Sequence, residues 1–395
     1  MHPVARLDDV LSPEGWCFAS STPVDARDPG RFNALFGRDS LITALQLLPA
    51  RPDVARATLR ALARLQGRED DPETDEEPGR IVHEYRPDPP ERFIVRDWPL
   101  RDGELRYYGS ADSTSWFLVL LAALDEPALS RELEASWRAA AGWLLRALER
   151  GGGLVRYGPR TARAGLAHQG WRDSTDLTDP DTDGSGILRE DGSVPQSPLA
   201  DADTQAVALA ALRALALLSG DAAYRREADD LRARVEADFG PETMAVEADG
   251  REVSGAGSQQ GWLLWANALG PDAAALAAER LCRPDVLTEF GLRTLAEGHP
   301  QHRPTAYHRG AVWPFDSWIG WGGLRAAGRQ ADADRLRGGV LDALARLGDP
   351  VECYAVESGE PRVIPFACRA QAWTIGAAFA FTNDWDARGG YCAAP

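Results

Sequence analysis

The chain has 395 residues, of which 44% are hydrophobic and 13 are Trp, enough to form a large hydrophobic core. Its formal net charge is −17 and all its basic side chains are Arg. These features argue against a nucleic-acid partner and exclude Schiff-base chemistry on a lysine.

The N-terminal residues lack the charged-then-apolar pattern of a secretory signal. No stretch approaches the roughly 18 uninterrupted apolar residues of a membrane span. The five cysteines are scattered, with no CxxC spacing, which indicates reduced thiols and no zinc site. We therefore expect a cytoplasmic protein without a membrane partner.

Helical periodicity predominates along the chain, and the candidate helices tend to come in pairs. One member of a pair is rich in Trp, Gly and aromatic residues, and the other is an amphipathic helix of Ala, Leu and Arg. Runs typical of β-strands are few and short, as at 80–85. The predicted helices cover residues 39–49, 54–66, 111–124, 131–150, 201–218, 221–238, 258–269, 271–282, 309–327, 330–347 and 367–381.

Eleven helices in hairpins, plus one more near the N-terminus, predict a closed all-α ring of helix pairs. The helices rich in Trp and Gly would form the inner ring, and the amphipathic helices the outer ring. Long irregular segments alternate with the hairpins, so we expect them to share one functional face. These segments are 67–110, 151–200, 239–257, 283–308 and 348–366. No linker rich in Pro, Ser or Gly is present, which predicts a single domain, residues 1–395.

Two clusters of carboxylates, at 169–176 and 351–357, stand out because their acids lie among Trp, Tyr, Gly and Pro. A solvated surface would instead offer Lys, Glu and Gln. An aromatic floor with a few acids suits a protein that holds a sugar ring and cleaves its glycosidic bond. One acid must keep its proton to release the leaving oxygen, and the other must stay ionised to activate water.

Seven segments follow one another in the order of a known family. They begin at Phe36-Gly37-Arg38-Asp39-Ser40 and continue at 79–84, 107–114, 169–174, 291–295, 307–316 and 352–373. Together they resemble the glucosidase domain of glycogen debranching enzymes, the amylo-α-1,6-glucosidases. The resemblance implies an (α/α)6 toroidal barrel and an inverting, exo-acting α-glucosidase for oligosaccharides or glycogen-like glucans, with no cofactor. The last segment departs from the family, because Val351-Glu352-Cys353-Tyr354 stands where relatives have Pro-Glu-Leu-Phe.

The general acid should be a carboxyl group beside an aromatic wall, where exclusion of water raises its pKa. Asp173 and Asp176 both qualify. The resemblance favours Asp176, which leaves Asp173 as a ligand of sugar hydroxyls or as the alternate acid. The base should lie on an opposing loop, and Glu352 is favoured over Glu357. In an inverting enzyme the two carboxyl groups stand about 6.5–9.5 Å apart.

Arg38 and Asp39 suit a clamp for sugar hydroxyls, because a guanidinium donates two parallel bonds and a carboxylate accepts two. A buried ion pair that braces the barrel is the alternative. Trp171 and Trp313 offer flat faces for a pyranose ring, although Trp is also common in cores. The same segments supply further candidates for sugar binding: Glu84, Tyr108, Asp112, Arg172, Tyr307, Asp316 and Trp373.

The acidic stretch after the first cluster matches the spacing D-x-D-x-D-G-x5-E of a calcium loop. Its possible Ca²⁺ ligands are Asp179, Asp181, Asp183 and Glu190. The flanking sequence lacks the amphipathic helices of an EF-hand, and Gly186 occupies the usual apolar eighth position. An acidic, Gly-rich lid beside the acid is therefore favoured over a calcium site.

Three other functions remain open. A hydrolase of a small α-glucoside, such as glucosylglycerate or trehalose, would share the barrel and the acids. A sugar isomerase or epimerase on a helix-pair barrel would depend on His83 and His308, which are otherwise neutral partners for sugar hydroxyls. A non-catalytic carbohydrate-binding protein is disfavoured because both acid clusters are present.

Overall fold

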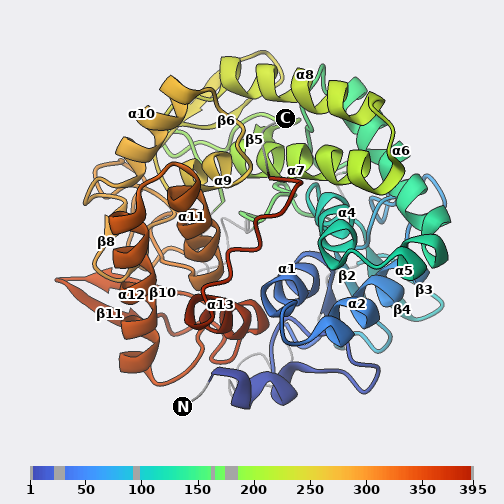
Figure 1. The fold of residues 1–395 in the computed structure, drawn as a ribbon, viewed down its shortest axis with the longest axis horizontal. Coiled ribbons are helices and arrows are strands. Elements are labelled where there is room, and N and C mark those ends of the chain that lie inside the picture. The colour runs from blue at the N-terminus through green and yellow to red at the C-terminus, as the bar shows by residue number, and fades with distance from the viewer. Residues whose placement is uncertain (1–2, 22–31, 92–97, 162–164, 174–185, 393–395) are drawn as a thin grey trace.

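The computed structural model describes residues 3–21, 32–91, 98–161, 165–173 and 186–392. Within these ranges six helices form an inner ring, in which each contacts the next and the last contacts the first (Figure 1). In ring order they are α1 (Gly37–Leu47), α4 (Ser113–Leu124), α7 (Ala202–Ser219), α9 (Gln259–Trp265), α11 (Pro314–Ala326) and α13 (Ala372–Thr382).

Five outer helices each pack against the inner helix that precedes them in the chain. They are α2 (Pro52–Arg64), α6 (Glu134–Arg150), α8 (Ala223–Asp238), α10 (Pro271–Leu281) and α12 (Gln330–Leu347). The sixth outer position is taken by a 3-10 helix, Pro3–Val10, which packs on α13. A short helix α5 (Pro127–Glu132) precedes α6. The predicted all-α (α/α)6 barrel is therefore confirmed, including its twelfth element near the N-terminus.

Side-chain pattern explains which helices lie inside. In α12 the buried residues are Ala333, Leu336, Val340 and Ala343, a single stripe spaced by three or four residues. In α11 nearly every residue is buried. Two glycines let α9 and α11 pack closely, because a Cβ on Gly261 would lie 2.6 Å from the Cα of Gly320.

Several predicted helix boundaries are wrong, and backbone pairing with loops explains two of them. The helix predicted to start at residue 309 begins at Pro314, because Trp313 is extended (φ −110°) and Val312 bridges to Tyr354. The helix predicted at 367 begins at Ala372, because Gln371 bridges to Ser20. The helix predicted over 131–150 is divided between α5 and α6. Helical periodicity cannot detect these long-range backbone bonds.

Small antiparallel sheets occupy the segments that lead from each outer helix to the next inner helix. One sheet has the order β1 (Leu35–Phe36), β2 (Glu84–Arg86), β4 (Glu104–Tyr107) and β3 (Leu100–Arg101). Another has the order β5 (Ala200–Asp201), β6 (Thr243–Val246) and β7 (Glu252–Ser254). Two hairpins pair β8 (Leu287–Thr288) with β9 (Gly291–Leu292), and β10 (Tyr354–Glu357) with β11 (Glu360–Val363).

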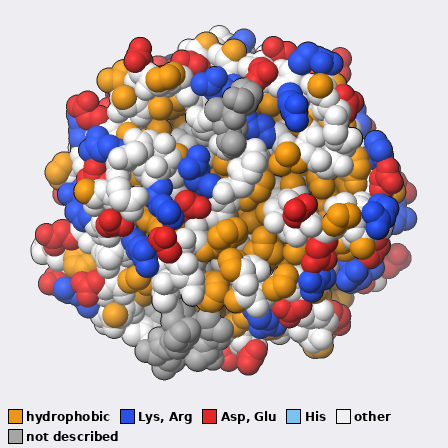
Figure 2. Space-filling model, viewed as in Figure 1, with side chains coloured by type: hydrophobic (Ala, Val, Ile, Leu, Met, Phe, Trp, Pro, Cys, Tyr) orange, Lys and Arg blue, Asp and Glu red, His pale blue; other side chains and the backbone are white. Residues whose placement is uncertain are grey.

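The opposite end of the ring is crossed by the C-terminal segment 383–392, drawn in red in Figure 1. The indole N–H of Trp385 donates to the Leu45 carbonyl (2.9 Å), and its own carbonyl accepts from Trp318 (2.8 Å). On this face hydrophobic side chains gather near the middle, among scattered charged side chains (Figure 2). Helix α7 is long and apolar enough to cross a membrane, but 83% of it is buried inside the barrel.

Candidate active site

Arg38, in the first turn of α1, has a buried guanidinium that binds a carboxylate at the N-terminus of α4. Arg38 donates from Nη1 to both oxygens of Asp112, at 3.0 and 3.2 Å, and from Nη2 to Oδ2 of Asp173. The side chains of Arg38 and Asp112 are 3% and 2% exposed, whereas that of Asp173 is 21% exposed. Of these three groups, Asp173 is the one that a ligand can reach.

Asp173 has the properties expected of a general acid. Burial raises the pKa of its carboxyl group; the Arg38 charge lowers it, the Asp112 charge raises it again, and it lies at about 6. The other candidate acid, Asp176, lies outside the described residues. Among the described residues of the first cluster, Asp173 is therefore a partly exposed carboxyl group with a raised pKa.

The second carboxylate, Glu352, lies just before β10 and is 2% exposed. Its Oε1 accepts a 2.5 Å hydrogen bond from the hydroxyl of Tyr307, and its Oε2 accepts from the backbone N–H of Cys368 at 3.0 Å. The alternative base, Glu357, ends β10 and pairs with Glu360 at the turn of the hairpin. The fixed position of Glu352 favours it over Glu357.

Asp39 links the two carboxylates. Its Oδ1 accepts a hydrogen bond from Gln371 (3.2 Å) at the start of α13. Burial raises the pKa of Asp39, Arg38 lowers it, and the charges of Asp173 and Glu352 raise it further, to about 8. The backbone N–H of Gln371 in turn donates to the carbonyl of Pro350 at 3.0 Å, two residues before Glu352. Hydrogen bonds through Arg38 and Gln371 therefore connect the segments of Asp173 and Glu352, although 179 positions separate these two carboxylates.

A wall of aromatic rings adjoins this cluster. Trp171 meets Trp313 edge-on at 5.7 Å and His308 at 5.2 Å, measured between ring centroids. Trp313 also stacks on His308 (5.3 Å) and donates its indole N–H to the carbonyl of Tyr307 at 2.7 Å. Trp373 contacts the same ring at 5.7 Å. Trp171, Trp313 and Trp373 therefore come together, although they belong to three separate loops and helix starts.

Two predicted sugar ligands are engaged in the core behind this wall. Arg172 is buried and donates to Asp203 (2.8 Å), the hydroxyl of Ser258 (2.9 Å) and the carbonyl of Thr294 (3.0 Å). Asp316 accepts from the indole of Trp262 at 2.7 Å. Burial raises the pKa of Asp316 to about 6. Because Arg172 and Asp316 bind protein groups, we assign them a role in positioning the aromatic wall and not in binding a sugar directly.

Sequence reasoning missed Asp203, Ser258 and Trp262, which fix those two side chains. Asp203 lies in the first turn of α7, where an acidic residue is expected simply as a favourable helix start. Nothing in the local sequence distinguishes it from other such residues. Arg172 and Asp203 form a buried ion pair at 2.8 Å. Burial raises the pKa of Asp203, while Arg172 lowers it.

The predicted site residues of the β2–β4 region are buried and contact protein groups. His83 is buried and meets the rings of Phe36 and Tyr107 edge-on, at 5.6 and 5.7 Å. Burial lowers its pKa well below the usual value, as it does for His308, so both imidazoles are neutral near pH 7. Glu84 forms an ion pair with Arg86. Within the described part of the chain, the two histidines share no ring contact with each other.

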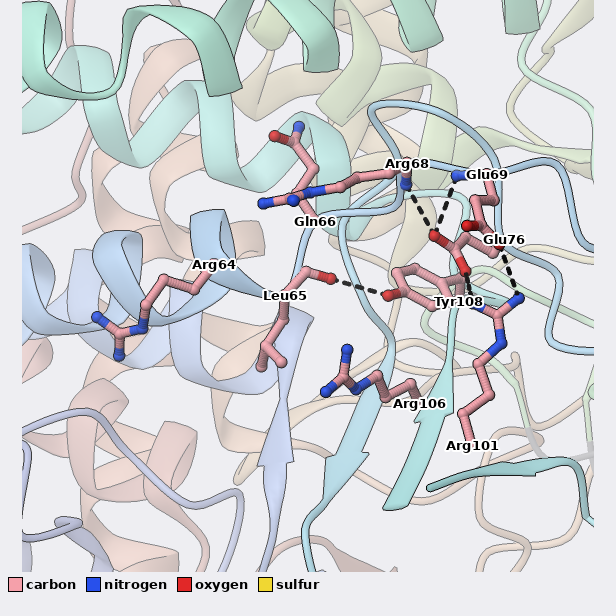
Figure 3. Close-up of a pocket in the computed structure, with 9 residues that line it drawn as sticks. All are labelled: Arg64, Leu65, Gln66, Arg68, Glu69, Glu76, Arg101, Arg106 and Tyr108. Carbon is pink, nitrogen blue, oxygen red and sulfur yellow. Dashed lines mark hydrogen bonds and ion pairs between the residues drawn. The ribbon is translucent and has the colours of Figure 1, made fainter. Parts of the chain in front are cut away.

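Tyr108 lines a separate polar pocket of about 250 Å³, between the end of α2 and the β2–β4–β3 sheet (Figure 3). Its hydroxyl donates to the carbonyl of Leu65 at 2.9 Å, and Arg101 turns toward Glu76 (2.9 Å). None of the other predicted site residues lines this pocket. Tyr108 is therefore placed apart from the cluster around Asp173.

The described residues include no group of three or more His, Cys, Asp or Glu side chains arranged to hold a metal ion. Three of the predicted calcium ligands, Asp179, Asp181 and Asp183, lie outside the described residues. Glu190 is described and exposed, and its backbone carbonyl accepts from the side chain of Gln301 at 2.9 Å. The calcium loop remains a prediction.

Solved structures share this fold. A GH63 mannosylglycerate hydrolase from Thermus thermophilus, in complex with Tris and D-glycerate, is 17% identical (TM-score 0.71), and the match covers 97% of this chain and 99% of that one. The same hydrolase in complex with glucose gives a TM-score of 0.70 at 17% identity, over 96% and 99%. A glycosidase variant in complex with glucose is 14% identical, with a TM-score of 0.59, over 97% and 95%.

No curated protein matches the sequence. Residues 39–374, most of the chain, match the family model described as the mannosylglycerate hydrolase MGH1-like glycoside hydrolase domain. The predicted enzyme class, a glycoside hydrolase on an (α/α)6 barrel, is confirmed, and the match carries nothing specific to amylo-α-1,6-glucosidases. The chain belongs to the MGH1-like glycoside hydrolase family.

Proposed function

We propose that this glycoside hydrolase is an inverting, exo-acting hydrolase of small α-glycosides, with Asp173 as general acid and Glu352 as general base. The hydrogen bonds that bring the segments of these two carboxylates together around Asp39 are the observation that carries the proposal. Glucosylglycerate and related α-glycosides of small polar aglycones are the substrate class. This choice is supported by the description of the matching family and by the glycerate and glucose bound to solved relatives.

The environment of Asp173 suits an acid that must begin the reaction protonated. A pKa of about 6 leaves a useful fraction of the carboxyl group protonated near neutral pH. Its partial exposure lets it approach a glycosidic oxygen. As the C–O bond breaks, the proton passes to the leaving alcohol, and Arg38 stabilises the carboxylate that is left behind.

Glu352 suits the role of base because both its oxygens are oriented. The Tyr307 hydroxyl and the Cys368 N–H hold the carboxylate plane fixed, so that it can accept a proton from a water molecule directed at the anomeric carbon. In this proposal the water attacks from the face opposite the leaving group, which inverts the configuration at that carbon.

The aromatic wall backs the proposed sugar site. Trp171, Trp313 and Trp373 are 2%, 1% and 4% exposed, and the other two pack around Trp313. They therefore hold the polar groups of the site in place and leave little open face for a pyranose. Asp39, with a pKa of about 8, is largely protonated at pH 7 and can donate a hydrogen bond to a hydroxyl as well as accept one. We also assign His308 to the sugar site. Its neutral imidazole contacts both Trp171 and Trp313.

Proton NMR of the anomeric signals tests the proposal. The purified enzyme is incubated with glucosylglycerate, mannosylglycerate, trehalose, isomaltose and a glycogen limit dextrin. We expect a small α-glycoside to be cleaved fastest, with the β-anomer of the sugar appearing before mutarotation. Release of the α-anomer would overturn inversion. Preference for limit dextrin would instead support the amylo-α-1,6-glucosidase interpretation of the motifs.

A further inference from the structure

One buried carboxylate of the site, Asp112, is not accounted for by the proposed chemistry. Both its oxygens already accept hydrogen bonds from Arg38, so this carboxylate is engaged by the protein. It lies at the N-cap position of α4, and its Oδ1 accepts a hydrogen bond from the hydroxyl of Ser110 at 2.8 Å. That hydroxyl is in turn 2.7 Å from the hydroxyl of Ser113. Asp112 is therefore fixed by its own helix start.

The orientation of Arg38 is set mainly by Asp112. Nη1 of Arg38 donates to both oxygens of this rigid carboxylate, whereas the bond from Nη2 goes to the more exposed Asp173. One cation therefore faces two anions, with one amino group directed at each. Without Asp112, the whole charge of Arg38 would face Asp173 and would stabilise its ionised form.

We propose that Asp112 is a positioning residue that aims Arg38 at Asp173 and offsets the arginine charge, so that the acid keeps its proton until catalysis. This inference rests on the proposed role of Asp173. Arg38 can then stabilise the carboxylate of Asp173 that forms during proton transfer, without ionising this acid before the reaction. The raised pKa of Asp173, to which the Asp112 charge contributes, agrees with this arrangement.

The other charged groups near Asp173 do not replace Asp112. Asp39, the next residue of α1, has a pKa of about 8 and is largely protonated near pH 7, so it adds little negative charge beside Asp173. On the α7 side, Asp203 is neutralised by its ion pair with Arg172 at 2.8 Å. Among the described residues, Asp112 is therefore the anion that shares the guanidinium with the acid.

The test is the pH dependence of kcat in Asp112→Asn, compared with Ser110→Ala and Asp112→Glu. Asparagine keeps the shape but removes the charge, so the alkaline limb of the profile should move to lower pH by about one unit or more. Ser110→Ala removes the 2.8 Å bond to Asp112 but no charge, and should keep the wild-type limb. Asp112→Glu restores the charge and should also keep it.

A uniform loss of kcat at every pH in Asp112→Asn would reduce Asp112 to a structural role and overturn the inference. If Asp112→Asn does not fold, a displaced limb in Asp112→Glu would overturn it equally. Carbon-13 NMR titration of the aspartate carboxyl groups gives a readout without substrate, and the Asp173 pKa should fall in Asp112→Asn. An active Asp173→Asn enzyme would refute the proposed acid itself, which is a separate result.

Discussion

The hydroxyl of Tyr307 donates a hydrogen bond of 2.5 Å to Oε1 of Glu352, across 45 positions of sequence. Tyr307 belongs to the loop before α11, and Glu352 to the loop before α13. The same tyrosine contacts Trp313 at 4.5 Å between ring centroids. The proposed base and the aromatic wall are therefore held by one side chain.

Replacement of Tyr307 by Phe should lower kcat by about 10- to 100-fold with little effect on folding. A hydrogen bond to a charged group is worth about 1.5–3 kcal/mol, and its loss lets the carboxylate of Glu352 rotate. Steady-state kinetics and circular dichroism measure the two effects. Tyr354→Phe is the matched control, because that buried hydroxyl bonds to the carbonyl of Phe290 and should affect stability only. Wild-type turnover in Tyr307→Phe would argue against Glu352 as base.

Asp173→Asn and Glu352→Gln should each reduce turnover by orders of magnitude while the thermal unfolding temperature stays close to that of the wild type. Each amide keeps the shape of its acid but cannot donate or accept the catalytic proton. Asp176→Asn is the comparison that separates the two candidate acids. If Asp176→Asn is inactive and Asp173→Asn is active, the acid is Asp176 and the role we assign to Asp173 is wrong.

The free energy of unfolding should fall as the pH rises from about 7.5 to 8.5. Asp39 has a pKa of about 8 in the folded protein, far above that of an unfolded Asp, so the folded state holds a proton that the unfolded state has released. Stability is then lost with increasing pH, by at most about 1.4 kcal/mol per pH unit for one proton. Urea unfolding at a series of pH values measures the slope.

The same slope should become shallower in Asp39→Asn, which has no proton to release. Burial lowers the pKa of His83 and His308 in the folded protein, so these residues make stability rise with pH up to about 7, where their unfolded forms lose their protons, and the window for Asp39 lies above that pH. A slope that is unchanged in Asp39→Asn would show that Asp39 is ionised in the folded enzyme at neutral pH.

Arg172→Lys should destabilise the fold by about 1–3 kcal/mol, because lysine keeps the charge beside Asp203 but leaves buried polar groups without their hydrogen-bond partner. The guanidinium of Arg172 donates hydrogen bonds to Asp203, Ser258 and Thr294. The ammonium group of a lysine cannot reach all three partners in this geometry. Arg138→Lys is the control, because its bond to Glu134 is on the surface and contributes little. Denaturant midpoints that are equal for the two variants would contradict the assigned role of Arg172.

Helix periodicity and spacing were sufficient to predict the barrel. The sequence of an outer helix such as α12 contains a stripe of apolar residues that becomes its buried side. The sequence of an inner helix such as α11 is rich in Trp, Gly and other residues that can be buried on all sides. The positions of the long segments in the chain also predicted the functional face, because every one of them leads from an outer helix to the start of an inner helix. These are properties of neighbouring residues, and the sequence displays them directly.

The composition of the site was less predictable. Arg172 and Asp316 carry the residue types of sugar ligands, but their hydrogen bonds to Asp203, Ser258 and Trp262 place them among the supports of the wall. Tyr108 lies within a matching segment and still faces a different pocket. A motif specifies residue identity, whereas the partner of a side chain depends on which distant loop packs against it.

The sequence by itself determined the class of fold, the enzyme class and the two carboxylate clusters, because periodicity, composition and motif order are local properties of the chain. Only the tertiary structure decided that Arg38 divides its charge between Asp112 and Asp173, and that Tyr307 orients Glu352. The proton affinity of a carboxyl group depends on burial and on nearby charges, and ring closure brings these together from residues far apart in the chain.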